Sequence, residues 1–182
     1  MKITGVKTNI FSSGHRNAKR NWLLLRIQTD QGLEGVGEAS MLGNDKLVAS
    51  LLQDWADRYL IGKDPLSAQV HWTRLYQDNN GRGGRLFSTA LSGVDIALWD
   101  LRGKILNIPI YQLLGGPYQE KIRVYANGWY SNPASPDVIS SEAKEVVSMG
   151  YTALKFDPFG RVAYSTISPH EAQLSVDRVA AV

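Results

Sequence analysis

The feature that most constrains the fold is the segment from Ala90 to Gly115, ALSGVDIALWDLRGKILNIPIYQLLG. Apolar residues recur along it at the three- and four-residue spacing of one helix face: Leu91, Val94, Leu98 and Leu101. This spacing predicts a helix from about Ser88 to Leu106, followed by a Pro-anchored turn that ends in Gly-Gly-Pro. Two carboxylates, Asp95 and Asp100, are set into the helix, and we expect both to be structural.

The residues before this helix predict an antiparallel sheet and two further helices. The strands are expected at Met1–Phe11, Asn21–Thr29 and Leu33–Ala39. Asp30-Gln31-Gly32 is a short hairpin connection between the second and the third strand. One helix is expected to start at Asn44 or Asp45 and the next at Asp64-Pro65, which suits an N-cap followed by the first helical position. His71, on the second of these helices, is expected to face solvent.

The pattern changes after Gly116-Pro117. Strands are expected at Lys121–Tyr130 and Tyr151–Phe156. Helices are expected to open at Ser135-Pro136 and at a capping box formed by Ser168 and Glu171. A strand–helix–strand–helix order implies parallel strands joined by right-handed crossovers.

The order of residues in the long helix and the following turn resembles a signature of the mandelate racemase/muconate lactonizing enzyme family, in the enolase superfamily. The matching positions are Ala90, Ser92, Gly93, Val94, Asp95, Ala97, Leu98, Asp100, Leu101, Gly103, Lys104, Pro109, Ile110, Leu113, Leu114 and Gly115. The resemblance implies an α+β capping domain, a three-stranded antiparallel meander plus helices, followed by the start of a (β/α)8 TIM-type barrel.

We expect the capping domain at residues 1–118 and the first two βα units of the barrel at residues 119–182. A closed barrel of this type takes about 250 residues. We therefore expect the chain to be the N-terminal part of a longer enzyme, cut inside the second barrel helix.

Lys155-Phe156-Asp157 ends the second expected barrel strand. Active sites of such barrels lie at the C-terminal ends of the strands, and residues two apart on a strand share a face. Many members of the resembled family carry Lys-x-Lys at this place. Lys155 matches the first lysine, which contacts the substrate carboxylate region, and Asp157 replaces the second, which is often a base. Both are therefore catalytic candidates, while the residues alone also fit an ordinary ion pair or a simple turn.

The resemblance also implies residues that bind the substrate. The polar segment from Ser12 to Arg20 matches in place a cap loop that closes over the substrate in this family. Its basic candidates are His15, Arg16 and Lys19. Asn127 and Tyr130 follow the first barrel strand and could line the same pocket. The alternatives are a solvated basic loop for the first group and packing under the cap for the second.

The implied cofactor is Mg²⁺, which holds the ene-diolate in enolase-type sites. In the resembled family its carboxylate ligands stand at the ends of the third, fourth and fifth barrel strands, and this sequence includes none of those strands. No acidic cluster in the sequence has the spacing of an oxygen-ligand site. No metal ligand is therefore assigned in this chain, and the ligands are expected beyond Val182.

The carboxylate at position 157 argues against a two-base racemisation, in which a base serves each face of the α-carbon. The implied function is a Mg²⁺-dependent lyase that dehydrates a sugar acid to a 2-keto-3-deoxy acid through an enediolate, with the base supplied later in the chain. A racemase, epimerase or cycloisomerase of the same superfamily is the alternative. A non-catalytic binding or assembly protein that uses the cap fold is the alternative from another class.

Composition bounds the remaining possibilities. The chain has 182 residues, 43% of them hydrophobic, a formal net charge of +3, and no cysteine, which excludes disulfides and thiolate nucleophiles. The basic residues are scattered, so nucleic acid is not an expected partner. The N-terminus lacks the apolar region of a signal peptide, and no apolar run is long enough to span a membrane. We expect a cytoplasmic homo-oligomer whose partner is a small anionic sugar acid.

Overall fold

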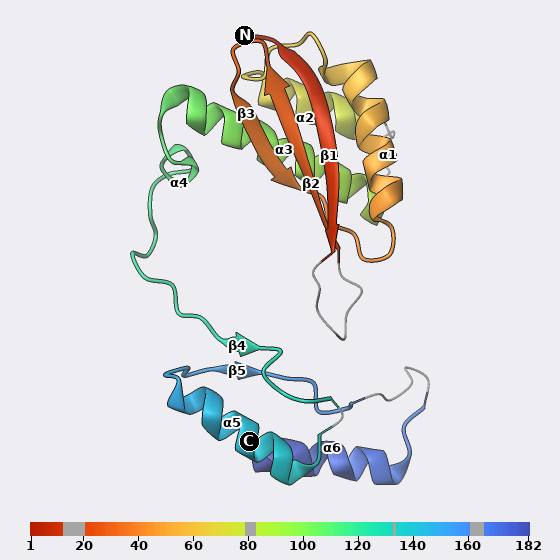
Figure 1. Cartoon of the computed structure of the whole chain (residues 1–182), viewed down its shortest axis with the longest axis vertical. Coiled ribbons are helices and arrows are strands. Elements are labelled where there is room, and N and C mark those ends of the chain that lie inside the picture. The colour runs from red at the N-terminus through yellow and green to blue at the C-terminus, as the bar shows by residue number, and fades with distance from the viewer. Residues whose placement is uncertain (13–20, 79–82, 133, 161–165) are drawn as a thin grey trace. The chain divides into compact units, whose positions relative to one another are not determined.

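A computed structural model describes residues 1–12, 21–78, 83–132, 134–160 and 166–182. The chain forms two compact units, an N-terminal unit from Met1 to Tyr118 and a C-terminal unit from Gln119 to Val182 (Figure 1). No helix in the described ranges is both long and apolar enough to cross a membrane.

The N-terminal unit contains the expected three-stranded antiparallel meander. Its strands are β1 (Ile3–Ser12), β2 (Asn21–Thr29) and β3 (Glu34–Glu38), in the order β1-β2-β3. Alternation along β2 decides which side is covered, because Leu23, Leu25 and Ile27 are fully buried whereas Trp22 and Arg26 are exposed. The meander of the predicted capping domain is thereby confirmed.

Three longer helices complete the unit: α1 (Asp45–Trp55), which continues as a π-helical turn to Leu60, α2 (Ala68–Asp78) and α3 (Arg85–Leu106). Helices α1 and α3 contact the sheet, and α2 packs against α3 (Figure 1). The predicted apolar stripe of α3 is the centre of the core, since Val94, Leu98 and Leu101 are buried. A short helix, α4 (Ile110–Leu113), follows the turn at Asn107.

Two glycines of β3 let α3 lie directly against the sheet. A Cβ on Gly35 would stand 2.1 Å from the carbonyl oxygen of Ala97, and a Cβ on Gly37 would stand 2.0 Å from that of Gly93. Both distances are far below van der Waals contact, so no side chain fits at either position. The Gly-x-Gly pattern of β3 is therefore a packing device between strand and helix.

Two local sequence predictions need correction. The helix expected at Asp64-Pro65 begins instead at Ala68, because Asp64 forms a turn in which its carboxylate accepts a hydrogen bond from the Leu66 amide at 3.0 Å. His71 was expected to face solvent but is buried, with its Nε2 atom 2.8 Å from the carbonyl oxygen of Asp64. The turn at Asp64 thus accounts for the later start of the helix, and its carbonyl oxygen supplies a hydrogen-bond partner for the buried imidazole of His71.

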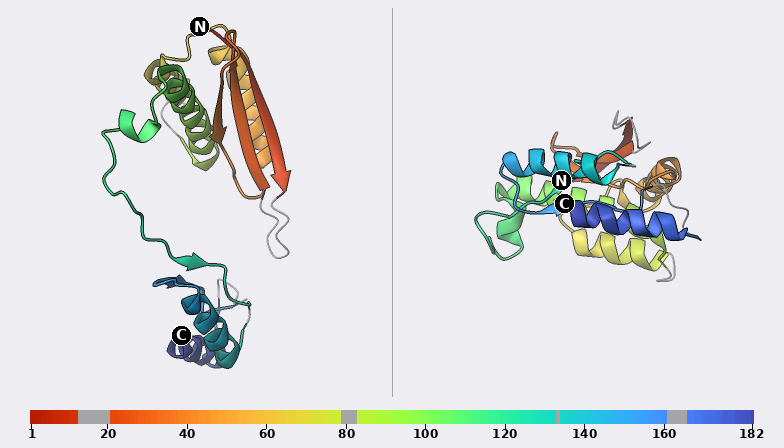
Figure 2. Two further views of the ribbon diagram at one scale, coloured as in Figure 1. Left: turned by 60° about the vertical axis from the view of Figure 1, so that its left-hand side comes forward. Right: turned by 90° about the horizontal axis from the view of Figure 1, so that it is seen from below.

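The C-terminal unit has the predicted strand–helix–strand–helix order. It consists of β4 (Ala126–Asn127), α5 (Pro136–Ser148), β5 (Leu154–Lys155) and α6 (Pro169–Ala181). The two strands pair in parallel, and α5 and α6 pack side by side (Figures 1 and 2). Ser168 and Glu171 form the predicted capping box at the start of α6. The strands are shorter than the sequence predicts, because only the residues that pair with a neighbour form a ladder.

Candidate active site

The candidate site lies at the carboxyl ends of β4 and β5. Asn127 and Lys155 occupy neighbouring register positions as the last residues of the two parallel strands, and both are exposed. Parallel strands present their carboxyl ends at one edge, where the loops that follow them also meet. The fold therefore brings these two residues together, although they are 28 positions apart in sequence.

Two hydrogen bonds join the segment after β4 to the segment at the end of β5. The indole Nε1 of Trp129 donates to the carbonyl oxygen of Lys155 at 3.0 Å. The amide of Asp157 donates to the hydroxyl oxygen of Tyr130, also at 3.0 Å. The rings of Trp129, Tyr130 and Phe156 pack edge to face, with centroids 5.4 to 6.0 Å apart. Tyr130 is thus bonded to the residue that the sequence singled out as catalytic.

Asp157 opens a turn. Its Oδ1 accepts a hydrogen bond from the amide of Phe159 at 3.0 Å, which leaves further acceptor capacity on an exposed carboxylate. The ion pairs within the described part of the chain involve other residues, so the simple Lys155–Asp157 ion pair is not formed. Lys155 and Asp157 each keep a charged group that can meet a ligand.

Side chains from the two helices hold the loops in place. Glu142 of α5 accepts hydrogen bonds from the Ser131 amide at 2.9 Å and the Ser131 hydroxyl at 2.5 Å. Arg178 of α6 donates to the carbonyl oxygens of Ala134 and Pro158 at 2.6 and 2.8 Å. Sequence reasoning missed both Glu142 and Arg178, because each acts on residues that only the fold brings near. A charged residue on a helix gives no sequence signal of such a role.

The remaining predicted site residues are not placed. His15, Arg16 and Lys19 lie outside the described residues. In the ranges that the structure does describe, no group of three or more histidine, aspartate or glutamate side chains could hold a metal ion. These residues do not form a Mg²⁺ site.

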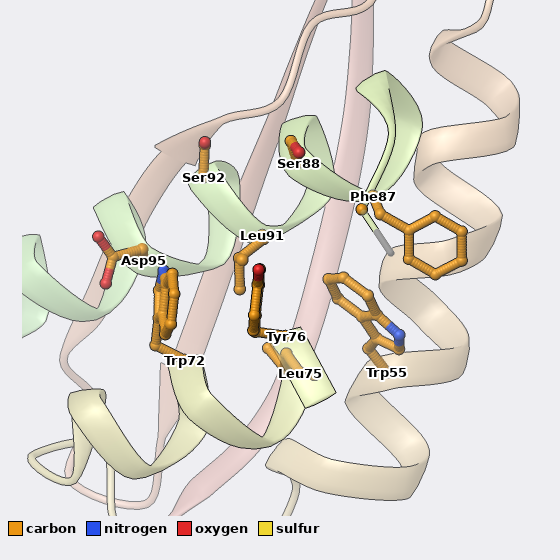
Figure 3. A pocket seen from close by; sticks show the side chains of 10 residues that line it. Trp55, Trp72, Leu75, Tyr76, Phe87, Ser88, Leu91, Ser92 and Asp95 are labelled. Carbon is orange, nitrogen blue, oxygen red and sulfur yellow. The ribbon is translucent and has the colours of Figure 1, made fainter. Parts of the chain in front are cut away.

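A separate cavity of about 250 Å³ lies within the N-terminal unit (Figure 3). Its walls come from α1, α2, α3 and the residue Gly83, and they are mostly aromatic and aliphatic: Trp55, Trp72, Leu75, Tyr76, Gly83, Phe87, Ser88, Leu91, Ser92 and Asp95. Burial raises the pKa of Asp95, while a hydrogen bond from Trp99 partly opposes the shift. The predicted catalytic and substrate-binding residues are not among those that line it.

Asp95 and Asp100 stand in α3, where a structural role is expected. For Asp100 the contacts agree with that role. Its Oδ2 accepts hydrogen bonds from the Val36 amide at 2.8 Å and from the Lys104 ammonium at 2.6 Å. The carboxylate therefore ties α3 to the edge of β3.

Comparison with known proteins identifies the class that this fold and site define. The sequence profile of the mandelate racemase / muconate lactonizing enzyme N-terminal domain matches residues 3–115, and the chain belongs to this family. A solved mandelate racemase/muconate lactonizing enzyme from Jannaschia sp. CCS1 superposes with a TM-score of 0.87 at 28% identity, covering 100% of this chain and 50% of that one.

Two curated proteins with similar sequences are both named as sugar-acid dehydratases. D-gluconate dehydratase of Thermoproteus tenax is 38% identical over 161 residues, which are 88% of this chain and 32% of that protein. D-galactonate dehydratase of Verminephrobacter eiseniae is 40% identical over 157 residues, which are 86% of this chain and 38% of that protein. The matched residues therefore span well under half the length of these two curated relatives.

Proposed function

We propose that this chain belongs to an enzyme that dehydrates a sugar acid to a 2-keto-3-deoxy acid. The observation that carries the proposal is the lysine and carboxylate, Lys155 and Asp157, two residues apart at the carboxyl end of β5. The named activities of the two curated relatives, both sugar-acid dehydratases, support the same reaction type.

Lys155 is proposed to stabilise the negative charge that develops when the α-proton is removed. An ammonium placed where an enediolate forms lowers the barrier because its attraction is strongest in the transition state. We propose that Lys155 binds the substrate anion, and that Asp157, which replaces the second lysine of the Lys-x-Lys pattern of the resembled family, leaves this strand end without a base lysine. The base is therefore expected elsewhere in the enzyme.

The reaction balances as a β-elimination. A base removes the proton on C2, the C3 hydroxyl leaves as water after protonation, and the resulting enol becomes the 2-keto acid. We propose that Asn127 and Tyr130 bind substrate hydroxyl groups at the same strand ends, since the Tyr130 hydroxyl still has its own proton to donate. His15, Arg16 and Lys19 are proposed to attract the substrate carboxylate by their positive charge.

The proposed cofactor is Mg²⁺, which would supply Lewis-acid stabilisation of the charge on the substrate. The described residues do not form a site for it, so its ligands are proposed to come from residues that this chain does not contribute. The roles assigned to Lys155, Asp157, Asn127 and Tyr130 do not depend on direct metal contact.

The test is incubation of the full-length enzyme in D₂O with a panel of sugar acids that includes D-gluconate and D-galactonate, followed by NMR. A dehydratase gives a 2-keto-3-deoxy product. Rapid exchange of the C2 proton with inversion, and no keto product, would show a racemase or epimerase instead. Binding of a panel member without turnover would favour a non-catalytic protein.

A further inference from the structure

Arg178 has an unusual set of partners for a charged side chain. It is half-buried on α6, and the ion pairs in the described ranges do not include it. Its Nε atom donates to the carbonyl oxygen of Ala134 at 2.6 Å, and its Nη1 atom donates to that of Pro158 at 2.8 Å. The guanidinium therefore joins two backbone segments instead of pairing with an acid.

The two carbonyl groups belong to the two loops of the candidate site. Ala134 lies in the connection that follows β4 and carries Tyr130, whereas Pro158 follows Asp157 directly after β5. The positions are 24 residues apart in sequence and 44 and 20 residues from Arg178. One side chain thus connects both loops, which are also joined by the 3.0 Å hydrogen bond from the Asp157 amide to the Tyr130 hydroxyl oxygen.

The chemistry of arginine suits this role better than a role in general stability. The guanidinium is planar and its N–H groups stand in a fixed fork, so two bonds to different carbonyls also fix the distance between those carbonyls. A lysine could donate to each oxygen, but its ammonium imposes no such fixed separation. A hydrogen bond from a charged donor is also stronger than a neutral one.

We propose that Arg178 is a positioning residue that sets the separation of the two loops and thereby aligns Tyr130 and Asp157 beside Lys155. The proposal rests on the proposed function, because alignment matters only if these groups act on a substrate. A shift of about 1 Å in such a constellation is enough to cost a large part of the rate. The geometry leads to a specific expectation, which is a loss in kcat greater than any change in KM.

The test uses the full-length enzyme with D-gluconate and D-galactonate as probes. We expect Arg178→Ala to lower kcat about tenfold or more, with KM changed by less than about threefold. Arg178→Lys should recover only part of the loss, because it keeps the charge and loses the fork. Millimolar methylguanidinium should partly restore kcat in Arg178→Ala and leave wild type unchanged. Lys144→Ala, at an exposed position of α5, is the matched control and should behave as wild type.

Amide hydrogen exchange supplies a readout that does not require activity. Arg178→Ala should increase exchange at the Ser131 amide, which is bonded to Glu142 of α5, and at the Asp157 amide, which is bonded to Tyr130 of the other loop, while the strands of the N-terminal unit keep their protection. An unchanged kcat with unchanged exchange would overturn the proposal. Full recovery by Arg178→Lys, or a loss traced to unfolding of the whole C-terminal unit, would also overturn it.

If wild type converts no sugar acid in the panel, the proposed function fails instead. Exchange at the two loops then still decides whether Arg178 holds them together.

Discussion

The N-terminal and C-terminal units are each stabilised internally by a different kind of interaction. The large buried apolar cluster of the described residues lies entirely in the N-terminal unit, from Ile3 to Leu101. The C-terminal unit buries mostly small apolar side chains, such as Ala126, Ala134 and Ala143, and leaves Val176 and Val179 more than half exposed. Its loops are held by side-chain hydrogen bonds to backbone groups. The difference suggests that the first unit is specified by packing and the second by polar contacts around its strand ends.

The contrast predicts that substitutions in the first unit act on stability and substitutions in the second act on activity. Four predictions test this division, in order of decreasing expected effect.

The largest effect is expected at the contact between β3 and α3. Gly37→Ala should lower the free energy of unfolding by about 3 kcal/mol or more, because the new Cβ would stand 2.0 Å from the Gly93 carbonyl oxygen and must push two backbones apart. Urea unfolding followed by circular dichroism measures this. Gly5→Ala is the control in the same sheet, since its Cβ would meet its nearest atom, Gln28 Oε1, at an ordinary 3.5 Å. Equal stability of the two variants would contradict the packing argument.

The next largest effect concerns activity alone. Lys155→Met should lower kcat/KM for the sugar acid by roughly 10²-fold, the scale of losing one preorganised charge-stabilising group, with little change in unfolding. Lys144→Met, at an exposed position on α5, should retain full activity. Steady-state kinetics of both variants decide the matter. Activity of Lys155→Met within about threefold of wild type would reject a catalytic role for Lys155.

A smaller effect is expected where a neutral hydrogen bond supports the site. Trp129→Phe keeps an aromatic ring beside Tyr130 and Phe156 but removes the indole N–H that donates to Lys155. A neutral hydrogen bond contributes about 1 kcal/mol, so kcat/KM should fall about fivefold. The same substitution at Trp72, whose ring stacks on Tyr76 in the N-terminal unit, should leave kcat/KM unchanged. Similar kcat/KM values for the two variants would argue against the division in which the C-terminal unit governs activity and the N-terminal unit governs stability.

The smallest effect is a pH dependence of stability in the N-terminal unit. Burial raises the pKa of Asp95, so the folded state binds its proton more tightly than the unfolded state does. This group therefore favours folding below the unfolded pKa of about 4, and that contribution is lost as pH rises through the folded pKa. Asp95→Asn should raise stability slightly near pH 7, by at most about 0.5 kcal/mol because the carboxyl is partly in water.

The gain from Asp95→Asn should shrink as pH falls toward 4, since wild-type Asp95 then becomes protonated. Thermal unfolding of wild type and variant at several pH values measures the difference. Asp57→Asn is the control, because that carboxylate is exposed and is not part of an ion pair among the described residues. A gain that grows toward acid pH would show that burial is not the cause of the shift.

The sequence by itself determined the regular elements and the likeness that led to the family. Helical spacing in α3 and the Ser168–Glu171 capping box are local patterns, and the structure has both. Alternation in β2 and the hairpin at Gly32 likewise predicted the meander, because side-chain period and turn chemistry act over only a few residues. The Lys155–Asp157 spacing was also visible in the sequence, although its catalytic role remains a proposal.

The tertiary structure decided everything that depends on residues distant in sequence. The requirement for glycine at positions 35 and 37 follows from the packing of α3 against β3. The burial of His71 follows from the turn at Asp64, whose carbonyl oxygen contacts the imidazole. The bonds from Trp129 to Lys155 and from Arg178 to both loops join residues 20 to 44 positions apart. Propensity and periodicity report on residues that are close in sequence. These contacts depend instead on how separate helices, strands and loops pack against one another.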